Sequence, residues 1–263
     1  MLGFEAGLKL SIGKISIEGK EHFKEIPRDR KVIVVSTHIT DMDIPLAAVA
    51  VGNDLDLAVT NMSTHHSLKT GAPLYLSMLL VGKDNFLPID FDDKKMVEKD
   101  TGLSVQKPGS FNPDNFTPMN EAMSKGKRIL MAGHNPSHNG KLGDPGYGAA
   151  YLSEIADAII LPVGVNIKAK DKDIALAGNN VKTFFNKPDA DVKIGEPFEL
   201  PKIEGIEDFS MLLKKRKELA EKGERLSDEE MERFSKLSSQ LRERSEQILA
   251  RLSVLVPEDK HKK

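Results

Sequence analysis

Residues 31–51 read K-V-I-V-V-S-T-H-I-T-D-M-D-I-P-L-A-A-V-A-V, and the pattern of this stretch changes midway. Its first part, Lys31–Ser36, is an apolar, largely β-branched run of the kind that forms a buried strand. Its last part, Ile44–Val51, has the apolar pattern of a helix. A buried strand that passes through a short polar turn into a helix is the repeating unit of an α/β fold.

The same alternation recurs further along the chain. Lys127–Ala132 (KRILMA) and Ala158–Val165 (AIILPVGV) are two more apolar strand-like runs, and the helical pattern of Gly148–Ala156 lies between them. Two shorter strands are expected around Asp173–Leu176 and Asp191–Ile194. We therefore expect an α/β fold in which a layered, mixed or mostly parallel sheet is flanked by helices.

The last quarter of the chain has a different composition. Ser227–Glu230 (SDEE) has the spacing of a capping box at a helix start. We predict a helical hairpin over Gly205–Pro257, and hence an α/β unit of residues 1–204 with a helical extension of residues 205–263. An apolar stripe of helical period, which predicts packing on the body or a homodimer through these helices, is formed by Met231, Phe234, Leu237, Leu241, Ile248, Leu252 and Leu255. Earlier in the chain, Gly102–Pro118 is rich in Pro, Gly, Asn and Ser and predicts a long surface loop.

Composition excludes several classes of protein. The 38 Lys and Arg residues nearly balance the 40 Asp and Glu residues, so no basic excess favours nucleic acid as a partner. The absence of cysteine excludes disulfides, thiolate zinc sites and cysteine nucleophiles, and fits a reducing compartment. No run of about 18 apolar residues predicts a spanning helix, and Met1–Ile17 lacks the pattern of a secretory signal. An amphipathic helix, either on a membrane surface or packed on its own domain, is predicted by Leu2, Phe4, Leu8, Leu10 and Ile12 of that segment.

The polar turn after the first strand carries a histidine and an aspartate, His38 and Asp43. Open α/β sheets bind their ligands at the carboxyl ends of strands, where His38 is expected. If His38 lies on the turn and Asp43 in the first helical turn, the carboxylate is expected to accept a hydrogen bond from one imidazole nitrogen and to fix the tautomer, while the other ring nitrogen removes a proton from a hydroxyl. On spacing alone, however, an ordinary loop histidine beside helix-capping aspartates is the better explanation.

The His38–Asp43 stretch resembles the first motif of the glycerophospholipid acyltransferases, the PlsC-type lysophosphatidate acyltransferase family, in which four residues separate the His from the Asp (the HX4D motif). Four further stretches resemble later motifs of that family in the same order, so the resemblance extends over roughly residues 15 to 200. They are Phe86–Asp93 (FLPIDFDD), Met131–Leu142 (MAGHNPSHNGKL), Ile160–Val165 (ILPVGV) and Val192–Pro197 (VKIGEP).

The sequence departs from the family pattern where the acceptor phosphate is expected to bind. In the third motif, Ala132 stands where the family has Glu, Gly133 is retained, and His134-Asn135 replaces Thr-Arg. In the second motif, Phe91 stands where the family has Arg. Two cations are therefore missing, and an arginine–phosphate contact is a strong interaction to lose.

The resemblance implies an enzyme of phospholipid biosynthesis, an O-acyltransferase that moves a fatty acyl group from acyl-CoA or acyl carrier protein to a hydroxyl of a lysolipid. His38 would be the general base, oriented by Asp43, and no cofactor beyond the acyl thioester is implied. Contacts to the acceptor or the oxyanion are expected from Gly133, His134, Asn135 and Lys141. A cytoplasmic location with peripheral attachment to the membrane follows from the lipid substrate.

Two other functions are compatible with the same residues. A non-catalytic or weakly active lipid-binding member of the fold would explain the altered third motif. A metal-dependent hydrolase would use His38 and Asp41 with other histidines, among them His65, His66, His134 and His138. Against a metal, no H-E-x-x-H or comparable pattern occurs, so no metal site is predicted. The sequence does not specify the acceptor, the acyl length or the thioester carrier.

Overall fold

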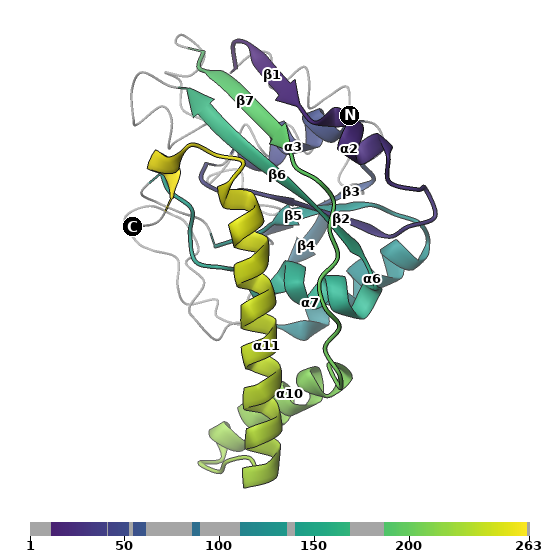
Figure 1. Ribbon diagram of the computed structural model, residues 1–263. Helices are drawn as coiled ribbons and strands as arrows, with labels where there is room; N and C mark the ends of the chain where they lie inside the picture. The colour runs from purple at the N-terminus through teal and green to yellow at the C-terminus, as the bar shows by residue number, and fades with distance from the viewer. Residues whose placement is uncertain are drawn as a thin grey trace.

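The fold is known from a computed structural model that describes residues 12–40, 42–52, 55–61, 86–89, 111–135, 140–168 and 187–261. Within these ranges it is an α/β structure built on one seven-stranded sheet in the order β1-β7-β6-β2-β5-β3-β4 (Figure 1). The strands are β1 (Ile15–Glu18), β2 (Val32–Ser36), β3 (Leu57–Asn61), β4 (Phe86–Ile89), β5 (Ile129–Ala132), β6 (Ile159–Lys168) and β7 (Asp189–Ile194).

The sheet is mostly parallel, as predicted. Only the β6–β7 pair is antiparallel among the strand pairs of the described residues. The central strand β2 lies between β6 and β5, and its last residue, Ser36, is in register with Val163 of β6 and Ala132 of β5. The carboxyl end of β2 therefore faces the two stretches that resemble the third and fourth family motifs. The predicted strand at Asp173–Leu176 lies outside the described residues.

The sheet is covered by helices on both faces, because its central strand β2 buries apolar side chains on both of them. In β2, Ile33 and Val35 contribute to the core on one face, while Val32 and Val34 contribute to the core on the other. The first face is covered by α6 (Thr117–Ser124), α7 (Tyr147–Ala156) and α11 (Asp228–Ser253), and the second by α2 (Lys20–Lys24) and α3 (Asp43–Val51). This arrangement confirms the predicted layered α/β fold.

One prediction about Gly102–Pro118 is wrong in the part that the structure describes. Residues 113–116 form a 3-10 helix, Pro113–Phe116, and α6 begins at Thr117. The side chain of Asn112 accepts a hydrogen bond from the amide of Asp114, and Pro113 occupies the first helical turn, where its missing N–H costs nothing. Phe116 is buried against Tyr151 and Phe111. The Asn and Pro residues that resemble a loop are therefore helix-start residues.

The predicted C-terminal hairpin consists of α10 (Glu207–Glu221) and α11, followed by a 3-10 turn, Glu258–Lys260. The capping box is present, since Ser227 accepts from the amide of Glu230 and the Glu230 side chain accepts from that of Ser227. Figure 1 shows α11 running along the body and extending beyond it with α10. The apolar residues of α11 belong to the same buried cluster as Ile33 and Val35 of β2, so the two units share a core. The boundary at residue 204 stays a prediction.

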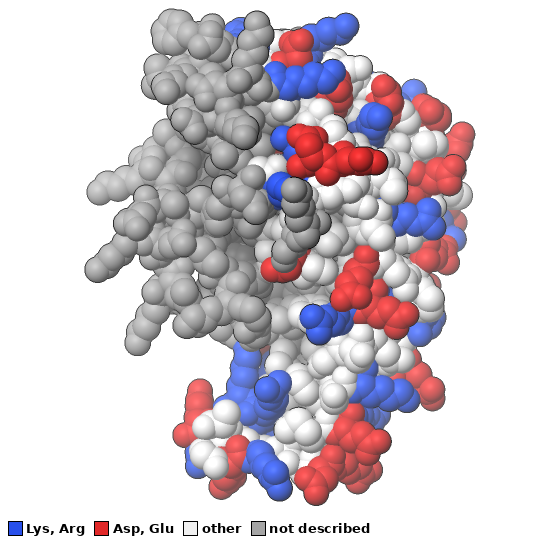
Figure 2. Space-filling view, turned by 60° about the vertical axis from the view of Figure 1, so that its left-hand side comes forward, with Lys and Arg blue, Asp and Glu red and all other residues white. Residues whose placement is uncertain are grey.

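The described helices include none that is long and apolar enough to cross a membrane. On the face shown in Figure 2, the acidic and basic side chains of the described surface are interspersed rather than gathered in patches of one sign. This agrees with the near balance of charge in the sequence.

Candidate active site

The predicted pair lies where the sequence places it, at the carboxyl end of the central strand. His38 is the second residue after β2, on a short turn, and Asp43 is the first residue of α3. Beyond the strand, the amide of Thr37 donates to the carbonyl of Val163 at 3.0 Å, so the chain is held against β6 up to the residue before His38.

Asp43 is fully buried beneath the turn and accepts hydrogen bonds on both carboxylate oxygens. The amide of Ile39 donates to Oδ2 at 2.9 Å, and Oγ1 of Thr40 donates to Oδ1 at 2.6 Å. Burial raises the pKa of Asp43 above its ordinary range, while the hydrogen bonds from Thr40 and Ile39, the positive charge of His38 and a hydrogen bond from Thr37 oppose that rise. The carboxylate therefore fixes the turn that carries His38.

His38 is half-buried, and its Nδ1 lies 3.3 Å from the carbonyl oxygen of Thr40. A carbonyl oxygen only accepts, so this contact is a hydrogen bond when Nδ1 carries the proton. The neutral ring then has its lone pair on Nε2. Thr40 thus contacts both members of the pair, through its carbonyl to His38 and through its hydroxyl to Asp43. This corrects the sequence-based expectation of a hydrogen bond from the imidazole to Asp43, because Nδ1 faces the Thr40 carbonyl instead.

The third-motif residues come to the same end of the sheet. Gly133 follows β5 and its amide donates to the carbonyl of Ser36 at 2.9 Å. His134 is buried, and its Nε2 accepts a hydrogen bond from the amide of His38 at 2.9 Å. The backbone of Asn135 is held by the carbonyl of Asp144.

Lys141, the fourth residue expected at the acceptor, lies in the same loop at intermediate exposure. Its neighbour Leu142 is buried in a small cluster with Ile39 and Val256. The amide of Leu142 donates to the carbonyl of Lys260 at 2.8 Å. The chain segment that follows α11 therefore packs directly on the turn that carries His38.

Sequence reasoning missed this C-terminal contact. Ile39, Thr40, Asn166 and Lys260 share the lining of a small cavity of about 10 Å³ beside the turn. No local pattern in residues 254–261 indicates such a contact, because it joins positions more than 200 residues apart. The role of Thr40 had a local signal, since a threonine three residues before an aspartate at a helix start has the spacing of a capping interaction.

In the part of the chain that the structure describes, no three histidine, aspartate or glutamate side chains gather into a metal-binding group. Asp41, His65, His66 and His138, which the metal hypothesis needs, lie outside the described residues, as does Phe91.

Comparisons with known proteins leave the family open. No protein-family model matches the sequence, and neither does any curated protein. A similar solved structure is the crystal structure of the 1-acyl-sn-glycerophosphate (LPA) acyltransferase PlsC from Thermotoga maritima, at 17% sequence identity and a TM-score of 0.46 over 86% of this chain and 78% of that chain.

Proposed function

We propose that the protein is an O-acyltransferase that transfers a fatty acyl group from acyl-CoA or acyl carrier protein to a hydroxyl of a lysolipid or related acceptor. The observation that carries the proposal is the joint contact of Thr40 with His38 and the buried Asp43 at the carboxyl end of β2. This arrangement supports a histidine base with a defined tautomer, and the five motif-like stretches in family order supply the reaction class.

The proposed reaction uses His38 as the general base. Its Nε2 takes the proton of the acceptor hydroxyl while that oxygen attacks the thioester carbonyl. The tetrahedral intermediate then collapses, the carbon–sulfur bond breaks, and the leaving thiolate takes the proton from the imidazolium. Asp43 favours the charged imidazole by its negative charge and holds the ring in place through Thr40. The products are the acyl ester and a free thiol.

The proposed acceptor contacts come from the loop after β5, whose His134 accepts from the amide of His38. The amide hydrogen of Gly133 is already used by the carbonyl of Ser36, and that of Asn135 by Asp144. The proposal therefore assigns acceptor or oxyanion contact to the side chains of Asn135 and Lys141 rather than to these backbone amides. A lipid acceptor would be reached from a membrane surface, and we propose a peripheral, cytoplasmic enzyme on that ground.

The test of the proposal is transfer of a labelled acyl group from acyl-CoA and from acyl carrier protein to a panel of lysolipids. We expect product and stoichiometric free thiol with the wild type, and at least a 100-fold loss of turnover with His38→Ala. Met211→Ala is the matched control, because Met211 is exposed on α10 and its substitution removes a side chain of similar length. No transfer by the wild type, or transfer that survives His38→Ala, would overturn the proposal.

Asp43→Asn separates the role of the charge from that of the fold. Asparagine keeps the size of the side chain. Its amide nitrogen, however, faces one of the two groups that now donate to the carboxylate, and two donors cannot form a hydrogen bond. We expect turnover to fall about 100-fold or more, by analogy with the loss of the orienting aspartate in catalytic triads. Circular dichroism should show a folded variant. Unchanged turnover would show that Asp43 only stabilises the turn before α3.

A second candidate function is lipid binding by a protein of the same fold that catalyses no reaction, or only a weak one. The observation in its favour is that His134, which stands in the third motif beside the place of the family arginine, is buried with its Nε2 occupied by the amide of His38. Native mass spectrometry distinguishes the two functions. Bound lysolipid that persists unchanged in the presence of acyl-CoA would favour binding over catalysis.

A further inference from the structure

His134 and His38 occupy equivalent positions on neighbouring strands. The register of β2 and β5 pairs Ser36 with Ala132, and each histidine is the second residue after its strand. Beyond this pair, one more backbone hydrogen bond joins the two chain segments, from the amide of Gly133 to the carbonyl of Ser36 at 2.9 Å. The next contact is made by a side chain instead of backbone, since the amide of His38 donates to Nε2 of His134 at 2.9 Å.

The contacts of His134 define its tautomer. Because Nε2 accepts the proton of the His38 amide, a neutral ring must carry its own proton on Nδ1. Nδ1 lies 2.7 Å from the carbonyl oxygen of Asn135, to which it donates. The amide of Gly143 is 3.2 Å from the same Nδ1, but two donors cannot bond to each other, so the shorter contact to the carbonyl is the hydrogen bond. Both ring nitrogens are then used within the protein.

The ring is also enclosed. His134 is 2% exposed, and burial lowers its pKa to about 4, so it is neutral in the ordinary pH range. Gly143 closes the far side of the ring, where an added Cβ would lie 2.1 Å from the Asn135 carbonyl oxygen and 3.1 Å from Nδ1. Gly146 donates from its amide to the carbonyl of Gly133 at 3.3 Å, which holds residues 143–146 against the end of β5. Nε2 of His134, which accepts the hydrogen bond from the His38 amide, therefore has a fixed position.

We propose that His134 is a positioning residue, whose neutral imidazole holds the backbone of His38 and so fixes the direction in which the His38 ring leaves β2. The inference rests on the proposed function for its catalytic consequence. His134 then has no part in binding the acceptor. A misplacement of about 1 Å in a catalytic group costs about 100-fold in rate, which sets the expected size of the effect.

The inference is tested with two variants. His134→Leu removes the hydrogen-bond acceptor of the His38 amide, whereas the side-chain oxygen of His134→Gln can still accept from that amide. We expect kcat to fall about 100-fold in His134→Leu with KM within a factor of three, and to recover about tenfold in His134→Gln. Leu237→Ala is the control for lost stability, because Leu237 is 2% exposed in the core on α11. Its kcat should match the wild type at a temperature where it is folded.

Amide hydrogen exchange provides a readout that needs no activity. We expect the His38 amide to be protected in the wild type and in His134→Gln, and to exchange at least tenfold faster in His134→Leu, while Val34 and Val35 stay protected. Protection of His38 that survives in His134→Leu, or a kcat unchanged by that substitution, would overturn the inference. If the wild type transfers no acyl group, the proposed function fails, and the exchange of the His38 amide alone decides whether His134 holds the turn.

Discussion

Thr40 explains how a half-buried histidine and a fully buried aspartate act together. Its hydroxyl donates to Asp43 and its carbonyl lies at Nδ1 of His38, so a change in either side chain is transmitted through one residue. The same hydroxyl accepts a hydrogen bond from the amide of Met42 at 3.2 Å. Both bonds of the Thr40 hydroxyl are buried, and in a buried place a missing hydrogen bond costs more than a formed one contributes. The turn therefore has one favoured conformation.

The titration of His134 gives a prediction at the residue scale. Its pKa is about 4 in the folded protein and 6.5 ordinarily, so between these values the unfolded chain binds a proton that the folded protein does not. This contribution to stability is complete above pH 6.5 and is lost as the pH falls to about 4, a change of about 3 kcal/mol. The difference in free energy of unfolding between wild type and His134→Gln should shrink by that amount from pH 7.5 to pH 4. Urea denaturation of both proteins at several pH values measures it, and a difference independent of pH would contradict it.

The sequence predicted the place of the His38–Asp43 pair but not its connections. The apolar run and the polar turn indicate local structure, and local structure was enough to put His38 after a strand and Asp43 at a helix start. The contact from His134 to the His38 amide joins residues 96 positions apart, and it depends on the register of β2 and β5. No pattern within one segment carries that register, so the part played by His134 required the structure.

At the scale of elements, the strands and helices with strong periodicity were predicted, while Pro113–Phe116 was not. Its Asn and Pro residues are typical both of loops and of helix starts. What decides between the two is burial of Phe116 against the aromatic rings of Tyr151 and Phe111, which come from other segments. The contact of the segment after α11 with β6 was equally invisible to the sequence, because Gly164 signals only a close approach and not its partner.

Gly164 provides the prediction at this scale. An added Cβ would lie 2.5 Å from Cβ of Leu255 and 2.9 Å from its carbonyl oxygen, so the segment after α11 must shift to admit any side chain. We expect Gly164→Ala to lower the free energy of unfolding by about 1–3 kcal/mol. Gly146→Ala is the matched control, since its nearest heavy atom would lie at an ordinary 3.7 Å. Chemical denaturation measures both. Equal stability of the two variants would contradict the close packing of residue 255 on β6.

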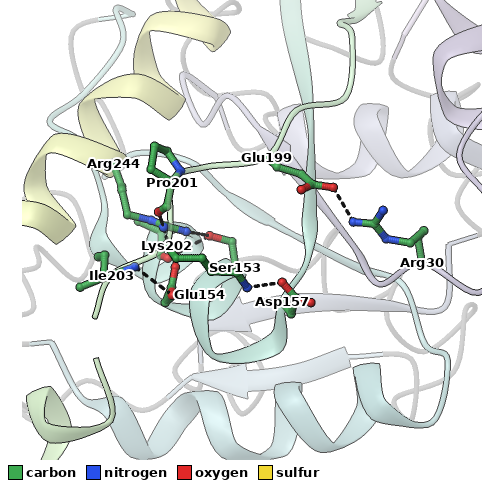
Figure 3. A network of polar contacts seen from close by, with 10 residues as sticks. Arg30, Ser153, Glu154, Asp157, Glu199, Pro201, Lys202, Ile203 and Arg244 are labelled. Atoms are coloured by element: carbon green, nitrogen blue, oxygen red, sulfur yellow. Dashed lines mark hydrogen bonds and ion pairs between the residues drawn. The ribbon is translucent and has the colours of Figure 1, made fainter. Parts of the chain in front are cut away.

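At the scale of the whole molecule, a buried ion pair joins the helical hairpin to the α/β body. Arg244 of α11 bonds to Glu154 of α7 at 2.5 Å, to Ser153 at 3.0 Å and to the carbonyl of Pro201 (Figure 3). Glu154 also accepts the amide of Ile203 at 3.0 Å. The network thus ties α11, α7 and the chain that leads into α10 to one another. A shared core and a shared polar network make the hairpin a structural part of the fold that carries the candidate site.

Arg244→Met tests this connection. It leaves the carboxylate of Glu154 buried without its cation, and both side chains of the pair are only 5% exposed. Removal of one partner of such a pair costs about 3–5 kcal/mol in free energy of unfolding. The double variant Arg244→Met/Glu154→Gln should recover much of that loss, because no charge stays buried and the glutamine oxygen can still accept the amide of Ile203.

The matched control is Arg30→Met, which breaks the pair between Arg30 and Glu199 that Figure 3 shows nearby. Both of its side chains are well exposed, so the expected loss is at most about 1 kcal/mol. Urea denaturation of the four proteins gives the comparison. A loss for Arg244→Met as small as that for Arg30→Met would mean that the hairpin is held by its apolar stripe alone. A loss of several kcal/mol that the double variant restores would show that the ion pair holds the two units together.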